Sequence, residues 1–368
     1  MAQHKESVSS LQISFMIMMF EIGSTPLFLL GGKAKQDSWL AMSAGAVAGG
    51  ILLLLFLWIQ HRCPKMDLIG MLKLHFGRIT GTVVGSVYCL YFAYESMRNV
   101  RDLGELTKMT LLPLTPMYIT MLIAVLIMGY AIWKGAEVVF RLPEVILPLV
   151  LSFYILLILL LALMGSLDFS RLLPMFENGI RSVIQAGIPD TVSFPFGQML
   201  AFLMLWSLWS KPGTPVKNTL VGYILISIFL VFMNAVNLAV LGPAFAATSQ
   251  LPFLQTVRTL SNLKFIERLD ILVTVLLFLG LLIKMMLFYY CAVRGTSALT
   301  RLPTKLMVFP VGLLIYATSF VEKDYTEHIA VGLGPSLKMD LVFQVGIPLI
   351  LCGAILIHGR KSKSASPS

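Results

Sequence analysis

Two stretches decide the fold that this sequence predicts: FEIGSTPLF at residues 20–28 and DTVSFPFGQ at residues 190–198. Each stretch lies near the middle of a long apolar run. Proline removes a backbone donor and glycine lowers the cost of non-helical angles, so each stretch can unwind a helix. At membrane depth such unwinding is tolerated only where the backbone lines protein or a watery cavity. We therefore expect two broken transmembrane helices that face a common cavity.

The composition around these stretches is that of an all-α integral membrane protein. Of the 368 residues, 57% are hydrophobic and 12% are charged, with a mean hydropathy of +0.86. Soluble domains carry about 25% charged residues. Apolar runs long enough to cross a bilayer recur along the whole chain and predict about ten spans. We place them near residues 11–32, 38–59, 79–108, 117–134, 142–164, 184–209, 217–241, 266–293, 304–321 and 339–358.

The two breaks lie close to half a chain apart, in the first and sixth of these spans. Discontinuous helices at corresponding positions of two halves are typical of inverted repeats with a midplane site. We predict one membrane domain over residues 1–360, with five-helix repeats near 11–164 and 184–358. The tail at 361–368 is expected to be disordered and cytoplasmic.

Charge predicts the orientation of the chain. The formal net charge is +10, and the basic residues are scattered singly in short loops. They are more frequent in the loops that share a side with the termini, which places both termini in the cytoplasm. This scatter does not resemble a nucleic-acid footprint. The four cysteines are far apart and predict neither a metal site nor disulfides.

Three segments carry a resemblance to a known family: FIERLD at 265–270, LDFSRLLP at 167–174 and YESMR at 94–98. They resemble the B subunit of the endospore germinant receptor, over essentially the whole chain, and Glu267-Arg268 is the most specific match. Relatives usually have a glycine-rich first break, whereas this chain has Gly23-Ser24-Thr25-Pro26. That departure affects the expected ligand more than the expected fold.

The resemblance implies a protein of the amino acid–polyamine–organocation transporter superfamily. It further implies a ligand-sensing subunit in the inner membrane of spores of an endospore-forming bacterium. Such subunits respond to small nutrients, amino acids above all, and act with a larger membrane A subunit and a C-subunit lipoprotein. Membrane lipid is the surrounding partner, and neither a cofactor nor a metal is implied.

The first break supplies the first candidate ligand contacts. A half-helix that begins at a break directs unpaired backbone donors and a positive dipole end into the cavity, where a carboxylate would be held. Gly23, Ser24 and Thr25 are the expected contacts. The alternative is that the two hydroxyls only bond carbonyls of their own helix.

The sixth span supplies the second set of contacts. Phe194, Phe196 and Gly197 could form the wall that meets a ligand's side chain. The alternative for these aromatic residues is ordinary packing.

Charged residues concentrate in the third span. Glu95, Arg98 and Arg101 are unusual within a transmembrane helix. We interpret them, with Glu267 and Arg268 at the start of the eighth span, as a structural ion network at the outer end. A role in a vestibule that admits solute is the alternative.

Three further charges fall within the spans. Glu21 and Asp190 lie near the breaks and are candidates for a proton or polar path, or for side chains that face a polar cavity. Lys284 lies deep in the eighth span. We expect its side chain to snorkel toward the cytoplasm rather than to take the place of a bound ion.

Enzyme chemistry is not indicated, because the sequence has no nucleophile elbow, P-loop or metal-ligand spacing. Three functions remain open. The first is a receptor subunit that binds a small nutrient between the breaks and signals to its partners. The second is a proton-coupled amino-acid permease, and the third is a channel or scaffold subunit of a membrane complex.

Overall fold

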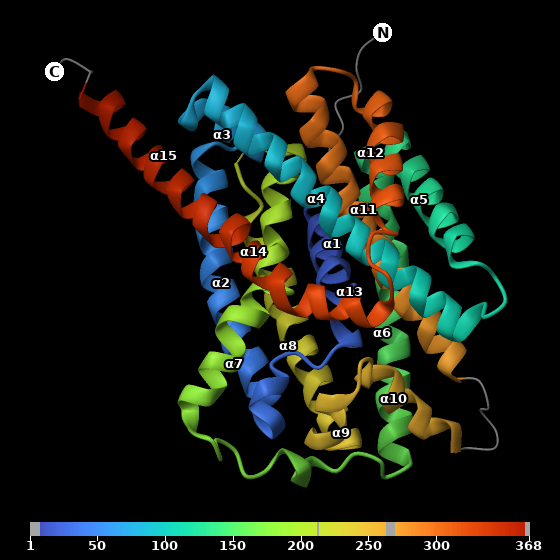
Figure 1. Ribbon diagram of the computed structural model, residues 1–368. Coiled ribbons are helices and arrows are strands. Elements are labelled where there is room, and N and C mark those ends of the chain that lie inside the picture. The colour runs from blue at the N-terminus through green and yellow to red at the C-terminus, as the bar shows by residue number, and fades with distance from the viewer. Residues whose placement is uncertain (1–7, 212, 263–268, 365–368) are drawn as a thin grey trace.

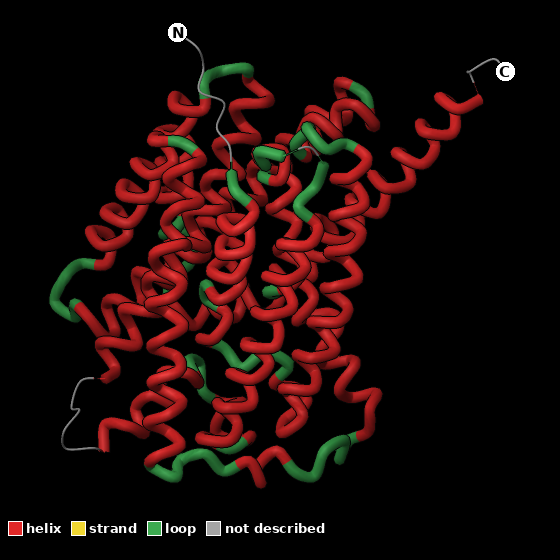
Figure 2. The backbone as a smooth tube through the Cα atoms, turned by 180° about the vertical axis from the view of Figure 1, so that it is seen from behind, coloured by secondary structure: helices red, strands yellow, loops and turns green. Residues whose placement is uncertain are grey.

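A computed structural model describes residues 8–211, 213–262 and 269–364, and this part of the chain is a bundle of helices with loops at its two ends (Figure 2). No strand occurs within these ranges apart from one isolated bridge between Val8 and Trp209. The predicted all-α class is therefore confirmed.

The α-helices are α1 (Ser10–Ile22), α2 (Ser38–Arg62), α3 (Leu68–Phe76), α4 (Arg78–Leu106), α5 (Met117–Lys134), α6 (Ala136–Leu163), α7 (Gly179–Ser193), α8 (Val216–Leu241), α9 (Pro243–Thr248), α10 (Pro252–Arg258), α11 (Leu269–Thr300), α12 (Thr304–Thr318), α13 (Tyr325–Val331), α14 (Leu337–Leu341) and α15 (Ile347–Ser364). The 3₁₀ segments are η1 (Thr25–Leu27), η2 (Gly32–Asp37), η4 (Phe169–Leu172), η5 (Phe196–Met204), η6 (Trp206–Leu208) and η7 (Thr259–Asn262). The π-helical segments are η3 (Thr107–Leu111), η8 (Gly332–Ser336) and η9 (Val342–Gly346).

Both predicted breaks are present. α1 ends at Ile22, and Gly23 follows with φ 20° and ψ −115°, a region that side-chain-bearing residues rarely adopt. α7 ends at Ser193, and after the extended Phe194 the chain continues as the 3₁₀ segment η5. In each case the α-helix stops where the proline and glycine chemistry predicts.

Six helical segments in the described residues are long and apolar enough to cross a membrane. They are Gly32–Arg62, Met117–Lys134, Ala136–Leu163, Val216–Leu241, Thr274–Thr300 and Tyr325–Ile357. The apolar α12 is shorter, at 15 residues. α1 and α7 are shortened by their breaks, and α4 is long but carries several charges in its second half.

Three elements differ from the sequence-based expectation. α3 lies in a segment that was predicted as a loop. The last helical run begins at Tyr325, ahead of the predicted start near 339, because the π-helical segments η8 and η9 let it bend without ending. α15 continues to Ser364, past the predicted end of the last span near residue 358.

Close packing around the breaks depends on glycine. A Cβ at Gly45 of α2 would overlap Thr191 of α7, and a Cβ at Gly49 would overlap Phe196. The absence of side chains at Gly45 and Gly49 therefore allows α2 to pack closely against α7 and η5. In front of α1, the segment from α13 to α14 crosses the bundle and meets α4 (Figure 1). This crossing segment closes the space between the two breaks.

Candidate functional site

A cavity of about 50 Å³ lies between the two breaks, α4 and the crossing segment α13–α14. That volume is several times the space that one water needs. Its polar lining residues are Ser24, Tyr94, Glu95, Arg98, Asn99, Asp102, Gln198, Ser336 and Asp340. Phe28 and Phe194 supply apolar wall, and their rings meet edge to face with centroids 6.2 Å apart. The cavity is therefore small, polar on one side and aromatic on the other.

Hydrogen bonds on the polar side fix the direction of two amide groups. Gln198 Nε2 donates to Glu95 Oε2 at 2.8 Å, and Asn99 Nδ2 donates to the Glu95 backbone carbonyl at 2.8 Å. Both partners are pure acceptors, so each amide must present its nitrogen to them. The remaining oxygens, Gln198 Oε1 and Asn99 Oδ1, are buried and have no hydrogen-bond partner among the described residues. The cavity thus offers unused acceptors.

Acidic residues reinforce this excess of acceptors. Glu95, Asp102 and Asp340 line the cavity and are each less than one-tenth exposed. Arg98 is the only basic residue among the lining residues, and it is already paired, with its Nη1 2.8 Å from Glu322 Oε1. Buried acceptors and carboxylates favour a ligand that brings hydrogen-bond donors and positive charge.

A charged cluster behind the cavity joins α4 to the connection between α12 and α13. Arg98 Nη2 donates to the His328 carbonyl at 2.6 Å, and His328 lies between Glu322 (2.8 Å) and Asp102 (3.2 Å). Burial acts to raise the pKa of Glu322, but hydrogen bonds and charges from His328 and Arg98 outweigh it and lower that pKa below its usual value. Because Arg98 and Asp102 belong to both the cavity and the cluster, a change at one reaches the other.

Of the three contacts predicted at the first break, one lines the cavity and two do not. Ser24 lines the cavity. Thr25 does not, and its hydroxyl donates to the Glu21 carbonyl at 2.6 Å, which is the alternative that the sequence left open. Gly23 faces away from the cavity toward Lys284, whose side chain a Cβ at Gly23 would overlap.

The expected snorkelling of Lys284 is wrong. Its side chain is fully buried, and its Nζ lies 4.5 Å from the ring centroid of Phe194 and 5.4 Å from that of Phe20. Glu21 is also fully buried, interacts electrostatically with Lys284, and has no hydrogen-bond partner among the described residues for either carboxylate oxygen. The lysine stays inside because this carboxylate and two aromatic faces compensate its charge there.

The predicted contacts at the second break also divide. Phe194 lines the cavity. Phe196 packs on the other side, with its ring centroid 5.8 Å from that of Tyr223. Gly197 is a packing position, since a Cβ there would overlap the Gln344 side chain.

The remaining predicted residues lie elsewhere. Asp190 forms an ion pair with Lys33 at 2.6 Å, in which the side chains are 29% and 74% exposed, and it does not line the cavity. Arg101 pairs with Glu105, four residues further along the same helix, at 2.8 Å. Glu267 and Arg268 lie outside the described residues.

Sequence reasoning missed several groups of the cavity. Gln198 directly follows Gly197, the last residue of the second break that was proposed as a ligand contact. Asn99 lies within the charged run of α4, and Asp340 lies at the predicted start of the last span. Each is a polar residue in an apolar segment, and that signal could have drawn attention to them.

Comparison with known proteins gives the family. A family model described as "Spore germination protein" matches residues 7–327. The chain belongs to the spore germination protein family. This spore germination protein is 29% identical to spore germination protein KB of Bacillus subtilis (strain 168), over 98% of both chains. It is 22% identical to spore germination protein YndE of the same organism, over 88% of this chain and 90% of the relative. The family resemblance read from the sequence is confirmed.

A solved structure gives the fold. The spore germination protein superposes on a nucleobase-cation-symport-1 family transporter, in a closed conformation with bromovinylhydantoin bound, with a TM-score of 0.67 and 13% identity. The match covers 92% of this chain and 78% of the transporter. With its apolar helices, the spore germination protein is a multi-pass membrane protein of transporter-like fold. The relatives and this neighbour are named as germination proteins and a transporter, not as enzymes.

Proposed function

We propose that this chain is the nutrient-sensing membrane subunit of a spore germination receptor. It binds a small molecule, an amino acid in particular, between the breaks of its first and sixth spans. The observation that carries the proposal is the group of unused acceptors in the cavity, Asn99 Oδ1 and Gln198 Oε1, beside the carboxylates of Glu95 and Asp340. An ammonium group brings three donors and one positive charge, which this set of groups fits.

The rest of the ligand follows from the opposite wall. Ser24 faces the carboxylate end, where its hydroxyl would donate to the ligand, because only the single 3₁₀ turn η1 follows the first break and no longer half-helix begins there. Phe28 and Phe194 meet the ligand's side chain. In this proposal Gly23, Thr25, Phe196 and Gly197 hold the shape of the two breaks, and Glu21 with Lys284 fixes the charge behind them.

Signalling follows from the position of the cavity between parts of the bundle that can shift against each other. Ligand would favour one arrangement of the crossing segment α13–α14 relative to α4, because it contacts both. The Arg98 and His328 cluster would carry that change toward the α12–α13 connection. We further propose that two inverted five-helix halves form the fold and that both termini are cytoplasmic in the inner spore membrane. The A subunit and the C-subunit lipoprotein are the proposed recipients.

The test is thermal unfolding of the purified chain in detergent with a panel of amino acids, sugars and nucleosides. A ligand present at about 100 times its Kd should stabilise the folded state by about 2.7 kcal/mol. We expect stabilisation by an amine-bearing compound and none by sugars.

Two other outcomes would replace the proposal. Uptake of the labelled compound into vesicles that contain the chain alone would favour a permease. No stabilisation by any compound, together with ion conductance in the complex, would favour the channel or scaffold.

A further inference from the structure

A second hollow lies between α5 and α12 with α11 beneath. Its volume is about 360 Å³ and its lining is mostly apolar, with Lys305 as the charged residue among the lining residues. Tyr289 of α11 forms the floor between Gly129 and Gly312, and a Cβ at Gly312 would overlap the Tyr289 hydroxyl. That hydroxyl donates to the Val308 carbonyl at 2.5 Å. Because Gly129 and Gly312 have no side chains, the hollow reaches down to the Tyr289 ring. The Tyr289 hydroxyl is hydrogen-bonded to the backbone.

The rims of this hollow are exposed hydrocarbon. Leu126 of α5 is 57% exposed, and Phe309 and Leu313 of α12 are 74% and 55% exposed. In a multi-pass membrane protein such rims face lipid tails. The hollow is too small for a partner helix, which is about 10 Å across with its side chains. One extended hydrocarbon chain fits its shape better.

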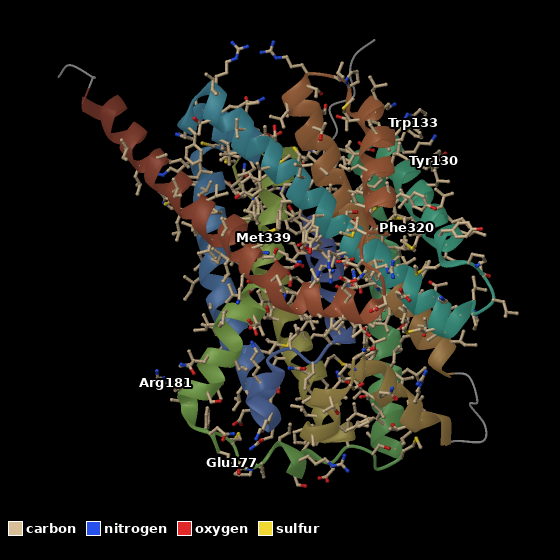
Figure 3. All side chains as sticks on the ribbon, viewed as in Figure 1. Tyr130, Trp133, Glu177, Arg181, Phe320 and Met339 are labelled. Atoms are coloured by element: carbon tan, nitrogen blue, oxygen red, sulfur yellow. The ribbon has the colours of Figure 1, made fainter. Side chains whose placement is uncertain are left out.

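Two lysines mark one end of the hollow. Lys134 Nζ lies 5.1 Å from the Tyr130 ring centroid and 5.4 Å from that of Trp133, and Lys305 Nζ lies 4.9 Å from the same Trp133 ring. Tyr130 and Trp133 lie at the upper end of α5, beside α12 (Figure 3). Tryptophan and tyrosine prefer the headgroup level of a bilayer. The two ammonium groups therefore flank one indole at the membrane surface.

In the described part of the chain, the positive charges of Lys134 and Lys305 are not neutralised by a paired carboxylate. Among the described residues, neither Lys134 nor Lys305 has an ion pair. α12 begins at Thr304 without a side-chain cap, so its first backbone donors and its positive dipole end lie at the same point. This end of the hollow therefore offers two ammonium groups and the positive end of the α12 dipole to an anion.

We propose that the hollow between α5 and α12 binds one anionic phospholipid, with its phosphate between Lys134 and Lys305 and one acyl chain along the floor at Tyr289. The charge of the lysines selects the anionic headgroup. The apolar length of the hollow selects a lipid over a soluble phosphate. Binding there would tie α5 to α12, which leads directly into the connection that carries Glu322.

Native mass spectrometry of the detergent-purified chain tests this site. The probes are dioleoyl phosphatidylglycerol and, as the zwitterionic comparison, dioleoyl phosphatidylcholine. We expect phosphatidylglycerol to be retained in preference, and Lys134→Gln/Lys305→Gln to weaken its retention roughly twenty-five-fold, since each surface lysine contributes about a factor of five. The matched control is Lys211→Gln/Lys217→Gln, which removes the same charge from two exposed lysines elsewhere.

A second variant tests the acyl chain. Leu313→Trp fills the exposed rim and leaves both lysines, and it should weaken retention as well. Equal retention by the two double variants would overturn the site, as would phosphatidylcholine bound as tightly as phosphatidylglycerol. Retention unchanged in Leu313→Trp would overturn the acyl-chain position.

Discussion

The two helix breaks solve the same local problem with different chemistry. At the first break, the Thr25 hydroxyl bonds back to the Glu21 carbonyl and Gly23 takes the unusual backbone angles. At the second, the single proton of the Ser193 hydroxyl is shared between the Pro189 carbonyl at 3.0 Å and, across the bundle, the nearer Leu337 carbonyl at 2.8 Å. The first break is closed within its own helix, whereas the second is tied to the crossing segment.

Their surroundings differ in the same sense. Behind the first break lie two buried charged residues, Glu21 and Lys284, which interact electrostatically but form no hydrogen bond among the described residues. In front of the second break lie the aromatic Phe194 and the amide of Gln198. Lys284 reaches both, because it touches Gly23 and lies over the Phe194 ring. The comparison shows that the buried charged residues lie behind the first break, whereas the second is connected to α14 through Ser193 and, in our proposal, recognises the ligand.

Lys284→Met should have the largest effect. It leaves the Glu21 carboxylate buried without its compensating charge, at a cost of about 3 kcal/mol in the free energy of unfolding. Thermal unfolding in detergent measures this loss. Glu21→Gln combined with Lys284→Met removes both charges and should recover most of the stability, so a double variant as unstable as the single one would contradict this compensation.

Gln198→Leu tests whether the second break recognises the ligand. It removes a donor to the Glu95 carboxylate and the free acceptor Oε1, so ligand affinity should fall about tenfold to a hundredfold. The control is Gln344→Leu, another buried glutamine, which bonds Tyr91 at 2.9 Å outside the cavity lining. If both variants lower the affinity equally, the effect comes from packing and not from recognition.

Ser24→Ala and Thr25→Ala separate two neighbours at the first break. Ser24 lines the cavity and its loss should lower ligand affinity roughly fivefold, the value of one neutral hydrogen bond. Thr25→Ala should leave ligand affinity unchanged, because the Thr25 hydroxyl already donates to the Glu21 carbonyl of its own helix. Titration of both variants with the same ligand decides the point, and the reverse order would return Thr25 to the ligand contacts.

Glu322→Gln should have the smallest effect, about 1 kcal/mol in stability, and only in part of the pH range. The pKa of Glu322 is lowered in the folded protein, so its ionised form stabilises the fold above the ordinary carboxyl pKa. That contribution disappears as the pH falls through the lowered value. Unfolding temperatures of the two proteins should therefore differ near neutrality and converge in acid.

The sequence predicted what local chemistry determines. The breaks follow from Gly23, Pro26 and Pro195, and α5 and α8 follow from uninterrupted apolar runs. The cavity did not follow, because its polar wall gathers Glu95, Gln198 and Asp340 from three helical segments far apart in the chain. The sequence of any one of these segments does not show that the three side chains meet in the folded protein.

Lys284 shows the same limit most clearly. Counting residues along one helix placed it near the cytoplasm, and only the positions of Glu21, Phe20 and Phe194 on other segments explain why it stays buried. The charged residues of α4 were interpreted as a network with Glu267 and Arg268, and the partner that Arg98 has in the structure, Glu322 in the α12–α13 connection, was not foreseen. Partners of buried charges come from tertiary packing, which a single sequence does not contain.

The most direct test of the ammonium site is calorimetric titration of the chain with an amine-bearing ligand from the panel and with its deaminated counterpart. If Asn99, Gln198 and the carboxylates hold the ammonium, loss of the amine should weaken binding about a hundredfold, since several charge-assisted hydrogen bonds are lost together. Equal affinity for the two compounds would contradict the account.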